Sequence, residues 1–322
     1  MACAEWSPYI GQTGAERVPG NDRPMLLKRL ASSAAALLLG LTGCAGVGVE
    51  TPPPGAVPGP ALWEVADEDT TIYLFGTVHA LPQGKNWFDG RIEQAFAASE
   101  ELVTEIDLAQ ATASAQSLAG AAQLPEGQTL RGLMAPDKRQ AFEASLVSLG
   151  LPVEALDRVE PWFAGMTLSY LPLARRGYET QSGVELALAG RAGEAKKRGA
   201  LETIEQQIAL FDTMPMEAQL AFLDEVVTAM PESANSLDAM VADWLEGDAA
   251  GLAKLLNAEL DNPALYQRLL TDRNANWAEW IDRRLEQPGT VFVAVGAGHL
   301  AGAGSVQDQL RKRGIKARRV WQ

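Results

Sequence analysis

The chain has 322 residues and a formal net charge of -14 at pH 7. Nucleic acids and anionic lipid headgroups attract proteins through clustered Lys and Arg, so we expect neither as a partner of this acidic chain. The residues after position 61 are numerous enough for one large domain with its own hydrophobic core.

The amino-terminal region has the pattern of a secretory signal. Residues 25–29 begin a short basic segment, and residues 30–41 are small and apolar, a run too short to span a membrane as a stable helix. The run ends in Leu41-Thr42-Gly43-Cys44, which resembles the lipobox of bacterial lipoproteins, where cleavage leaves the cysteine as a lipidated amino terminus. We therefore expect a lipoprotein signal peptide over residues 25–43 and lipidation of Cys44. The alternative is a buried helix with an incidental cysteine.

The segments on either side of this signal do not have the pattern of folded domains. Residues 1–24 fit neither a signal nor a domain, so we expect Met25 to be the native start. Residues 44–61 are rich in Pro and Gly, which favours an extended tether before a domain over residues 62–322. Ala45 after the cysteine resembles the sorting pattern for the outer membrane. We expect attachment to the bacterial cell envelope through the lipid anchor alone.

Two β-rich runs open the predicted domain, and a helix pattern follows them. Residues 62–66 and 71–75 flank Asp67-Glu68-Asp69, and this arrangement predicts a hairpin. Residues 88–99 then predict a helix.

A second strand is predicted over residues 102–107. Side chains alternate along a strand, so Glu105 and Asp107 would share one face near its carboxyl end. Two carboxylates at such a position are candidates for a functional site. The alternative is that Glu105 is simply solvated at the strand end.

The long central region predicts a series of helices. Residues 109–286 are rich in Ala, Leu, Glu and Gln and poor in β-branched residues. Breaks between the helices are expected at Pro125, Pro136, Pro152, Pro161, Pro172, Pro215, Pro231 and Pro263.

The carboxyl-terminal region returns to an α/β pattern. A strand is predicted over residues 290–295, a helix over residues 304–313 with Gly314 as its cap, and a last strand over residues 315–321. Strands near both ends with helices between them predict an α/β fold. We expect a mixed β-sheet formed by the N- and C-terminal segments, with a large central helical insertion.

The chain contains only two histidines, and each follows the same local pattern. Apolar runs of strand length end in Gly76-Thr77-Val78-His79 and in Gly296-Ala297-Gly298-His299. Glycine lets the backbone turn at the carboxyl end of a buried strand, where open α/β sheets bind ligands. One such histidine is more often structural, but the repetition favours a functional pair. We predict that the two imidazoles lie within about 10 Å of each other, because bonds to a shared metal ion are only about 2 Å long.

Several short motifs occur in a fixed order along the predicted domain. In chain order they are Leu62-Trp63-Glu64-Val65, Tyr73-Leu74-Phe75-Gly76-Thr77-Val78-His79, Glu105-Ile106-Asp107, Ser182-Gly183-Val184-Glu185, Leu201-Glu202-Thr203-Ile204-Glu205-Gln206, Arg273-Asn274 with Trp277, and Val295-Gly296-Ala297-Gly298-His299-Leu300 followed by Gly304-Ser305-Val306. Together they resemble the TraB/PrgY/GumN family, which includes the Tiki proteases. The ordered set is specific, whereas a single Gly-x-x-His motif is weak.

The resemblance implies an erythromycin-esterase-like and ChaN-like α/β fold with both histidines at one site. Tiki relatives are described as metal-dependent proteases. Carried over by position, the metal ligands would be His79, Glu105 and His299. The resemblance also makes Glu105 and Glu185 candidate catalytic acids and Arg273 a candidate catalytic cation.

The chemistry of these residue types agrees with a divalent metal site. Two imidazoles and a carboxylate suit Zn, Mn, Co or Fe and leave positions for water, while Arg273 could stabilise an oxyanion. The sequence has no H-E-x-x-H motif, so a zincin-type site is excluded. Purely structural roles are the alternative for these residues. Glu185 and Glu202 would then be ordinary helix acids, and Arg273 would form a cation–π packing pair with Trp277.

Three functions agree with these patterns. The first is a metal-dependent hydrolase, acting on a peptide or small-molecule substrate, that is anchored to the envelope by lipid. The second is a non-catalytic lipoprotein that binds metal or haem, and the third is a peptide-binding protein without turnover. Metal analysis separates the third from the others, and turnover of a peptide library separates the first from the second. The sequence leaves the oligomeric state open.

Overall fold

The computed structural model describes the chain in five stretches, which are residues 53–88, 90–109, 120, 122–259 and 262–321. All of them belong to the second of two compact units, Met1–Ala45 and Gly46–Gln322. The expected extension over residues 1–24, the signal peptide over residues 25–43 and Cys44 lie outside the described residues. No helix within the described stretches is long and apolar enough to cross a membrane.

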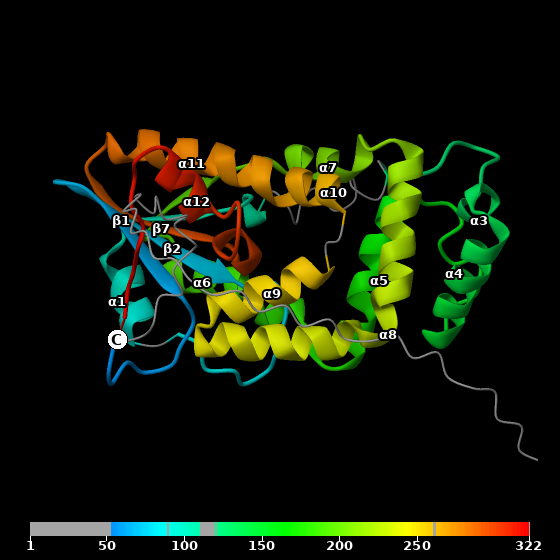
Figure 1. The fold of residues 1–322 in the computed structure, drawn as a ribbon, viewed down its shortest axis with the longest axis horizontal. Helices are drawn as coiled ribbons and strands as arrows, with labels where there is room; N and C mark the ends of the chain where they lie inside the picture. Colours follow the sequence, from blue (N-terminus) through cyan, green and yellow to red (C-terminus); the bar gives the residue numbers. More distant parts are fainter. Residues whose placement is uncertain (1–52, 89, 110–119, 121, 260–261, 322) are drawn as a thin grey trace, which may run out of the picture. The chain divides into compact units, whose positions relative to one another are not determined.

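Six strands of the described residues form one mixed sheet, in the order β6-β4-β7-β2-β1-β8 (Figure 1). Neighbouring strands among β6, β4, β7 and β2 are parallel, whereas β1 pairs antiparallel with β2 and with β8. The parallel strands therefore place their carboxyl ends at the same end of the sheet. The bounds are β1 Leu62–Ala66, β2 Thr70–Thr77, β4 Glu101–Thr104, β6 Lys197–Ala200, β7 Gly289–Gly296 and β8 Arg318–Arg319.

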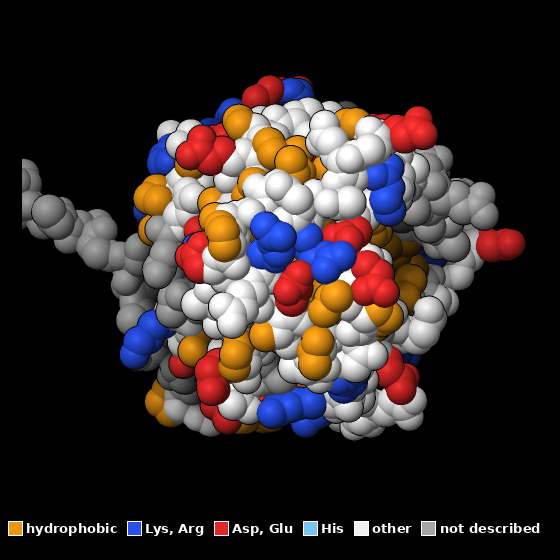
Figure 2. Space-filling model, turned by 90° about the vertical axis from the view of Figure 1, so that its right-hand side faces the viewer, with side chains coloured by type: hydrophobic (Ala, Val, Ile, Leu, Met, Phe, Trp, Pro, Cys, Tyr) orange, Lys and Arg blue, Asp and Glu red, His pale blue; other side chains and the backbone are white. Residues whose placement is uncertain are grey.

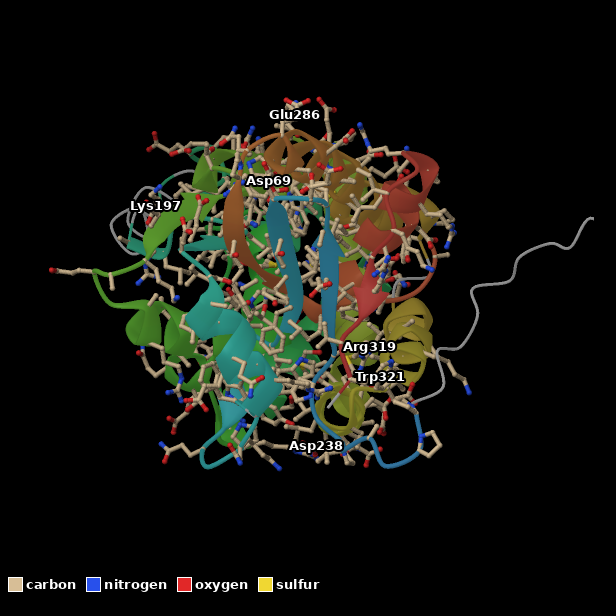
Figure 3. All side chains as sticks on the ribbon, turned by 90° about the vertical axis from the view of Figure 1, so that its left-hand side faces the viewer. Asp69, Lys197, Asp238, Glu286, Arg319 and Trp321 are labelled. Atoms are coloured by element: carbon tan, nitrogen blue, oxygen red, sulfur yellow. The ribbon has the colours of Figure 1, made fainter. Side chains whose placement is uncertain are left out.

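The predicted hairpin is confirmed and is formed by β1 and β2. Its turn is held by the Asp67 carboxylate, which accepts hydrogen bonds from the backbone N–H groups of Asp69 at 3.1 Å and Thr70 at 2.9 Å. In Figure 3, Asp69 marks this turn, and Arg319 and Trp321 lie toward the opposite end of the hairpin.

Helices cover both faces of the sheet. On one face, α1, α6 and the carboxyl-terminal part of α8 pack against Phe75 and Phe292. On the other, α11 and α12 pack against Leu74 and Val293. Neighbouring strand residues point into opposite layers, as the pleat requires, and the predicted α/β fold is confirmed. The bounds are α1 Gly90–Ala98, α6 Val184–Ala192, α8 Met216–Glu246, α11 Asp272–Leu285 and α12 Val306–Lys312.

The central region is mostly helical, as predicted. α4, α5 and the amino-terminal half of α8 share a separate core that includes Phe142, Leu168 and Leu223. Figure 2 looks at the end that carries α3 and α4, where acidic and basic side chains are interspersed. The bounds of the remaining helices are α3 Leu130–Leu133, α4 Pro136–Ser148, α5 Pro161–Arg175, η1 Thr180–Ser182, α7 Ile204–Asp212, α9 Ala249–Glu259, α10 Pro263–Tyr266 and the π-helical turn η2 Gln267–Thr271.

The prolines of the central region mark some helix boundaries but not all of those predicted. Pro136, Pro161 and Pro263 each stand in the first turn of a helix, where the missing N–H has no partner to lose. The breaks predicted at Pro172 and Pro231 are wrong, because these residues lie inside α5 and α8. Proline removes one helical hydrogen bond and tends to kink the helix, but it does not always end it.

Two strand predictions are corrected by the structure. The insertion is not purely helical, because β6 (Lys197–Ala200) comes from it and pairs with β4. The strand predicted over residues 102–107 ends at Thr104. Asp107 consequently does not share a strand face with Glu105 and instead accepts a hydrogen bond from the backbone N–H of Ala109.

The carboxyl-terminal elements follow the predicted order, with β7 slightly longer and the two later elements shorter than predicted. β7 and α12 agree with the predicted strand and helix, and Gly314 caps α12 with a φ of 79°. The last strand is limited to Arg318–Arg319 rather than residues 315–321. This short stretch pairs with β1, and just after it the Val320 N–H donates to the Leu62 carbonyl at 2.8 Å.

Candidate functional site

The two Gly-x-x-His motifs lie at the carboxyl ends of neighbouring parallel strands. β2 and β7 pair over their whole length, with Thr77 opposite Gly296. A Cβ on Gly76 would stand 3.0 Å from the Cα of Ala297, so glycine is what allows η3 (Ala297–Leu300) to lie against β2. The indole N–H of Trp244, from α8, donates to the Gly76 carbonyl at 2.8 Å and holds this turn.

Three predicted site residues gather around Gly296. A Cβ at this glycine would stand 3.1 Å from Glu105 Oε1, 3.6 Å from His299 Cδ2 and 3.8 Å from His79 Nε2. Both imidazoles thus have an atom less than 4 Å from the same position. The histidines therefore converge within the limit of about 10 Å that the repeated motif predicts. Their roles as metal ligands stay predictions.

His79 is oriented by a buried carboxylate. Its Nδ1 lies 2.7 Å from Glu185 Oε1, and the Thr77 hydroxyl donates to the same oxygen. The hydrogen bond to Glu185, followed by the attraction of its charge, raises the pKa of His79 from 6.5 to about 9. The imidazole is 73% exposed, so water screens part of this attraction. Because Nδ1 faces the carboxylate, Nε2 is the ring atom left for the site.

Gly183 explains how Glu185 reaches His79. A Cβ on Gly183 would stand under 3.0 Å from the carbonyl oxygens of His79 and Thr180. The backbone N–H of Val184 meanwhile donates to the Val78 carbonyl at 3.0 Å. The start of α6 therefore lies directly on the chain that follows β2, and only a residue without a side chain fits there.

Substitution of Gly183 by Ala is expected to cost about 1–3 kcal/mol of stability, the usual cost of overpacking. It should also lower the pKa of His79, because the added methyl group pushes α6 and Glu185 away from the imidazole. NMR titration of His79 and urea unfolding measure the two effects. Gly190→Ala, on the same helix with nothing within 4 Å of its Cβ position, should instead stabilise by about 0.5–1 kcal/mol. Equal behaviour of the two variants would contradict this view of Gly183.

His299 is buried and held as one tautomer. Asn274 Nδ2 donates to the Gly304 carbonyl at 2.9 Å, so its Oδ1 is the atom that faces His299 Nδ1 at 2.6 Å. Nδ1 therefore carries the proton, and Nε2 accepts from Arg273 Nη1 at 3.0 Å. Burial lowers the pKa of His299 from 6.5 to about 3. The ring also packs on Trp277, with centroids 4.3 Å apart.

Glu105 and Arg273 form a buried ion pair in the middle of the site. Arg273 Nη2 donates to Glu105 Oε2 at 2.7 Å, and the Gly296 N–H donates to Oε1 at 2.7 Å. Burial opposes ionisation of Glu105, but the charges of His299 in its protonated form, of Arg273 and of His79 outweigh it and lower the pKa of Glu105 to about 2. Glu105 is therefore not a solvated strand-end acid.

Glu202 is part of the site, although its sequence pattern suggested an ordinary helix acid. Its carboxylate accepts from Arg273 Nε and Nη2, both at 2.8 Å. It also accepts from Trp277 Nε1 at 3.1 Å and from Gln207 Nε2 at 3.1 Å. Glu202, Asn274 and Trp277 lie in motifs that carried the family resemblance, whereas no sequence signal pointed to Gln207.

Opposite pKa shifts of the two histidines predict a stability maximum near pH 6.5. The raised pKa of His79 gives stability that is present below 6.5 and lost as the pH rises toward about 9. The lowered pKa of His299 gives stability that is lost as the pH falls from 6.5 toward about 3. Urea unfolding across this range tests both limbs. His79→Gln should lose the alkaline limb only, and persistence of that limb would contradict the assignment.

Comparison with known proteins agrees with this geometry. Residues 61–319 match the model of the TraB/PrgY/gumN family. An uncharacterized protein of Treponema pallidum (strain Nichols) is 25% identical over 275 residues, which cover 78% of this chain and 80% of the relative. The uncharacterized protein YbaP of Escherichia coli (strain K12) is 25% identical, over 74% of this chain and 88% of YbaP.

A relative with a named activity is more distant. Metalloprotease TIKI1 of Danio rerio is 24% identical over 308 residues, which cover 79% of this chain and 62% of TIKI1. No solved structure gives a significant match. Since the family model covers the chain from just before β1 to β8, the chain belongs to the TraB/PrgY/gumN family.

Proposed function

We propose that the chain is a hydrolase of peptide bonds that works with a divalent metal ion held by His79, Glu105 and His299. The observation that carries the proposal is that the two histidines are held in the same arrangement. Each Nδ1 is bound by a side-chain oxygen, from Glu185 or Asn274, and each ring faces Gly296. Oxygen acceptors behind Nδ1 are typical of histidines that bind metal through Nε2.

The charge of the site also suits a metal ion. Within the described part of the chain, Glu105, Glu185 and Glu202 surround Arg273 and His79. A histidine that binds metal is neutral, so the carboxylates would then face the single charge of Arg273, and a divalent ion would balance the excess of negative charge. Imidazole and carboxylate donors fit Zn, Mn, Co or Fe. As the side chains stand, no group of three or more His, Cys, Asp or Glu among the described residues is arranged to hold a metal ion.

The chain's own residues can then carry the steps of hydrolysis. A bound metal ion would polarise a carbonyl and lower the pKa of its water. Glu105 would accept the proton of that water through the carboxylate oxygen that does not hold the metal ion, because its carboxylate and both histidines meet at Gly296. Arg273, fixed by Glu202, would stabilise the developing oxyanion through its planar set of N–H donors. Glu185 would keep His79 in place.

Metal content and peptide turnover together test the proposal. The purified domain should contain or bind one divalent ion and cleave members of a peptide library. A chelator should abolish cleavage, and added metal should restore it. Metal binding without turnover of any peptide would favour the non-catalytic metal- or haem-binding alternative. Peptide binding without metal would favour the third function.

We also propose that the protein is attached to the outer membrane through lipidated Cys44, on the basis of the signal and tether patterns in the sequence. Mass spectrometry of the membrane-extracted protein should find a diacylglycerol-modified amino terminus at Cys44. The Cys44→Ala variant should lose this modification. An unmodified chain that retains residues 30–43 would rule the anchor out.

A further inference from the structure

Arg273 occupies the coordination space that the proposed metal ion needs. Its Nη1 lies 3.0 Å from His299 Nε2, and its Nη2 lies 2.7 Å from Glu105 Oε2. A guanidinium group can only donate, so the lone pair of His299 Nε2 points at Arg273. A metal ion would need that same lone pair at a distance of about 2 Å. Nη1 and a metal ion therefore cannot share His299.

The guanidinium group has a second, independent anchor. Glu202 binds it through Nε and Nη2, and the Glu202 carboxylate is itself fixed by Trp277 and Gln207. The Trp277 ring lies 4.8 Å from the guanidinium carbon. Arg273 can thus give up His299 and still keep a carboxylate partner and an aromatic face.

We infer that Arg273 is a built-in cation that competes with the metal ion, so that metal enters only when Nη1 leaves His299 and the guanidinium swings on Glu202. This inference rests on the proposed metal site. The inference explains why the candidate metal ligands converge without forming a group that could hold a metal ion. Arg273 already donates hydrogen bonds to two of them, His299 and Glu105. It also gives the metal-free protein a way to keep its buried carboxylates paired.

Isothermal titration with Mn²⁺ and with Zn²⁺ tests the competition. Arg273→Met keeps a side chain about as long as the aliphatic stem of arginine but removes the guanidinium cation, and it should bind metal about 10- to 100-fold more tightly than the wild type, the scale on which neighbouring groups act on metal affinity. Arg273→Lys should fall between the two. Arg283→Met, on the same helix and paired with exposed Glu279, should leave the affinity unchanged.

A folding control keeps the test decisive. Arg273→Met leaves two buried carboxylates without their cation, so the double variant Arg273→Met/Glu202→Gln restores part of the charge balance. Both variants should show a larger metal-induced rise in Tm than the wild type. Metal binding by the wild type with equal or weaker binding by both variants would overturn the competition alone. Absence of binding in all three proteins would overturn the competition and the proposed metal site together.

Discussion

Glu105→Gln is expected to lower the free energy of unfolding by about 3–5 kcal/mol, the cost of removing one partner of a buried ion pair. Both oxygens of this carboxylate accept hydrogen bonds from N–H groups of the described residues. Gly296 donates to Oε1, and Arg273 and Gln207 donate to Oε2. A glutamine amide would turn its NH₂ group toward one of these donors in either orientation. Urea unfolding at neutral pH with a chelator present measures the loss.

A second glutamate on the same strand provides the control for this substitution. Glu101, at the start of β4, lies 3.7 Å from Arg284 Nε and is 23% exposed. Its replacement by Gln should cost less than about 1 kcal/mol, because this long, solvent-accessible ion pair has no buried charge to leave unpaired. Similar losses in the Glu105 and Glu101 variants would show that the network around Arg273 does not hold the site together.

The main elements of the fold could be predicted because their patterns are local. The hairpin and β7 have apolar runs and turn residues of their own. β6 could not be predicted, since its sequence Lys-Arg-Gly-Ala has no strand pattern, and it is a strand only because β4 offers a parallel edge. Continuation of α8 through Pro231 likewise could not be predicted, because proline in a helix interior favours a break.

The site was predictable as far as it depends on strand ends. His79, His299 and Glu105 each follow a parallel strand of one sheet, so adjacency brings them together. The contact between Glu202 and Arg273 joins positions 71 residues apart and arises from the packing of α11. Its geometry cannot be obtained from spacing. The opposite environments of the two histidines, one exposed and one buried, also come from tertiary structure.

Replacing either histidine by Ala is expected to lower peptide turnover by about 100- to 10,000-fold, the range for loss of a group that acts directly in proton transfer or metal-assisted chemistry. The structural costs should differ. His299 is buried against Trp277, so His299→Ala should cost about 2–5 kcal/mol of stability. His79 is 73% exposed, so His79→Ala should cost about 1 kcal/mol. Turnover and urea unfolding of each variant measure the two effects separately.

Glu185→Gln tests how far turnover depends on the environment of His79 while the histidine itself is kept. The amide oxygen can still accept from His79 Nδ1, but the charge that raises the pKa of the imidazole is gone. Turnover should fall only about 10- to 100-fold, as for other groups that orient a functional histidine. Glu93→Gln, on the exposed face of α1, should be without effect. Full turnover in a folded protein that lacks both histidines would reject the mechanism, and the converging imidazoles would then be structural.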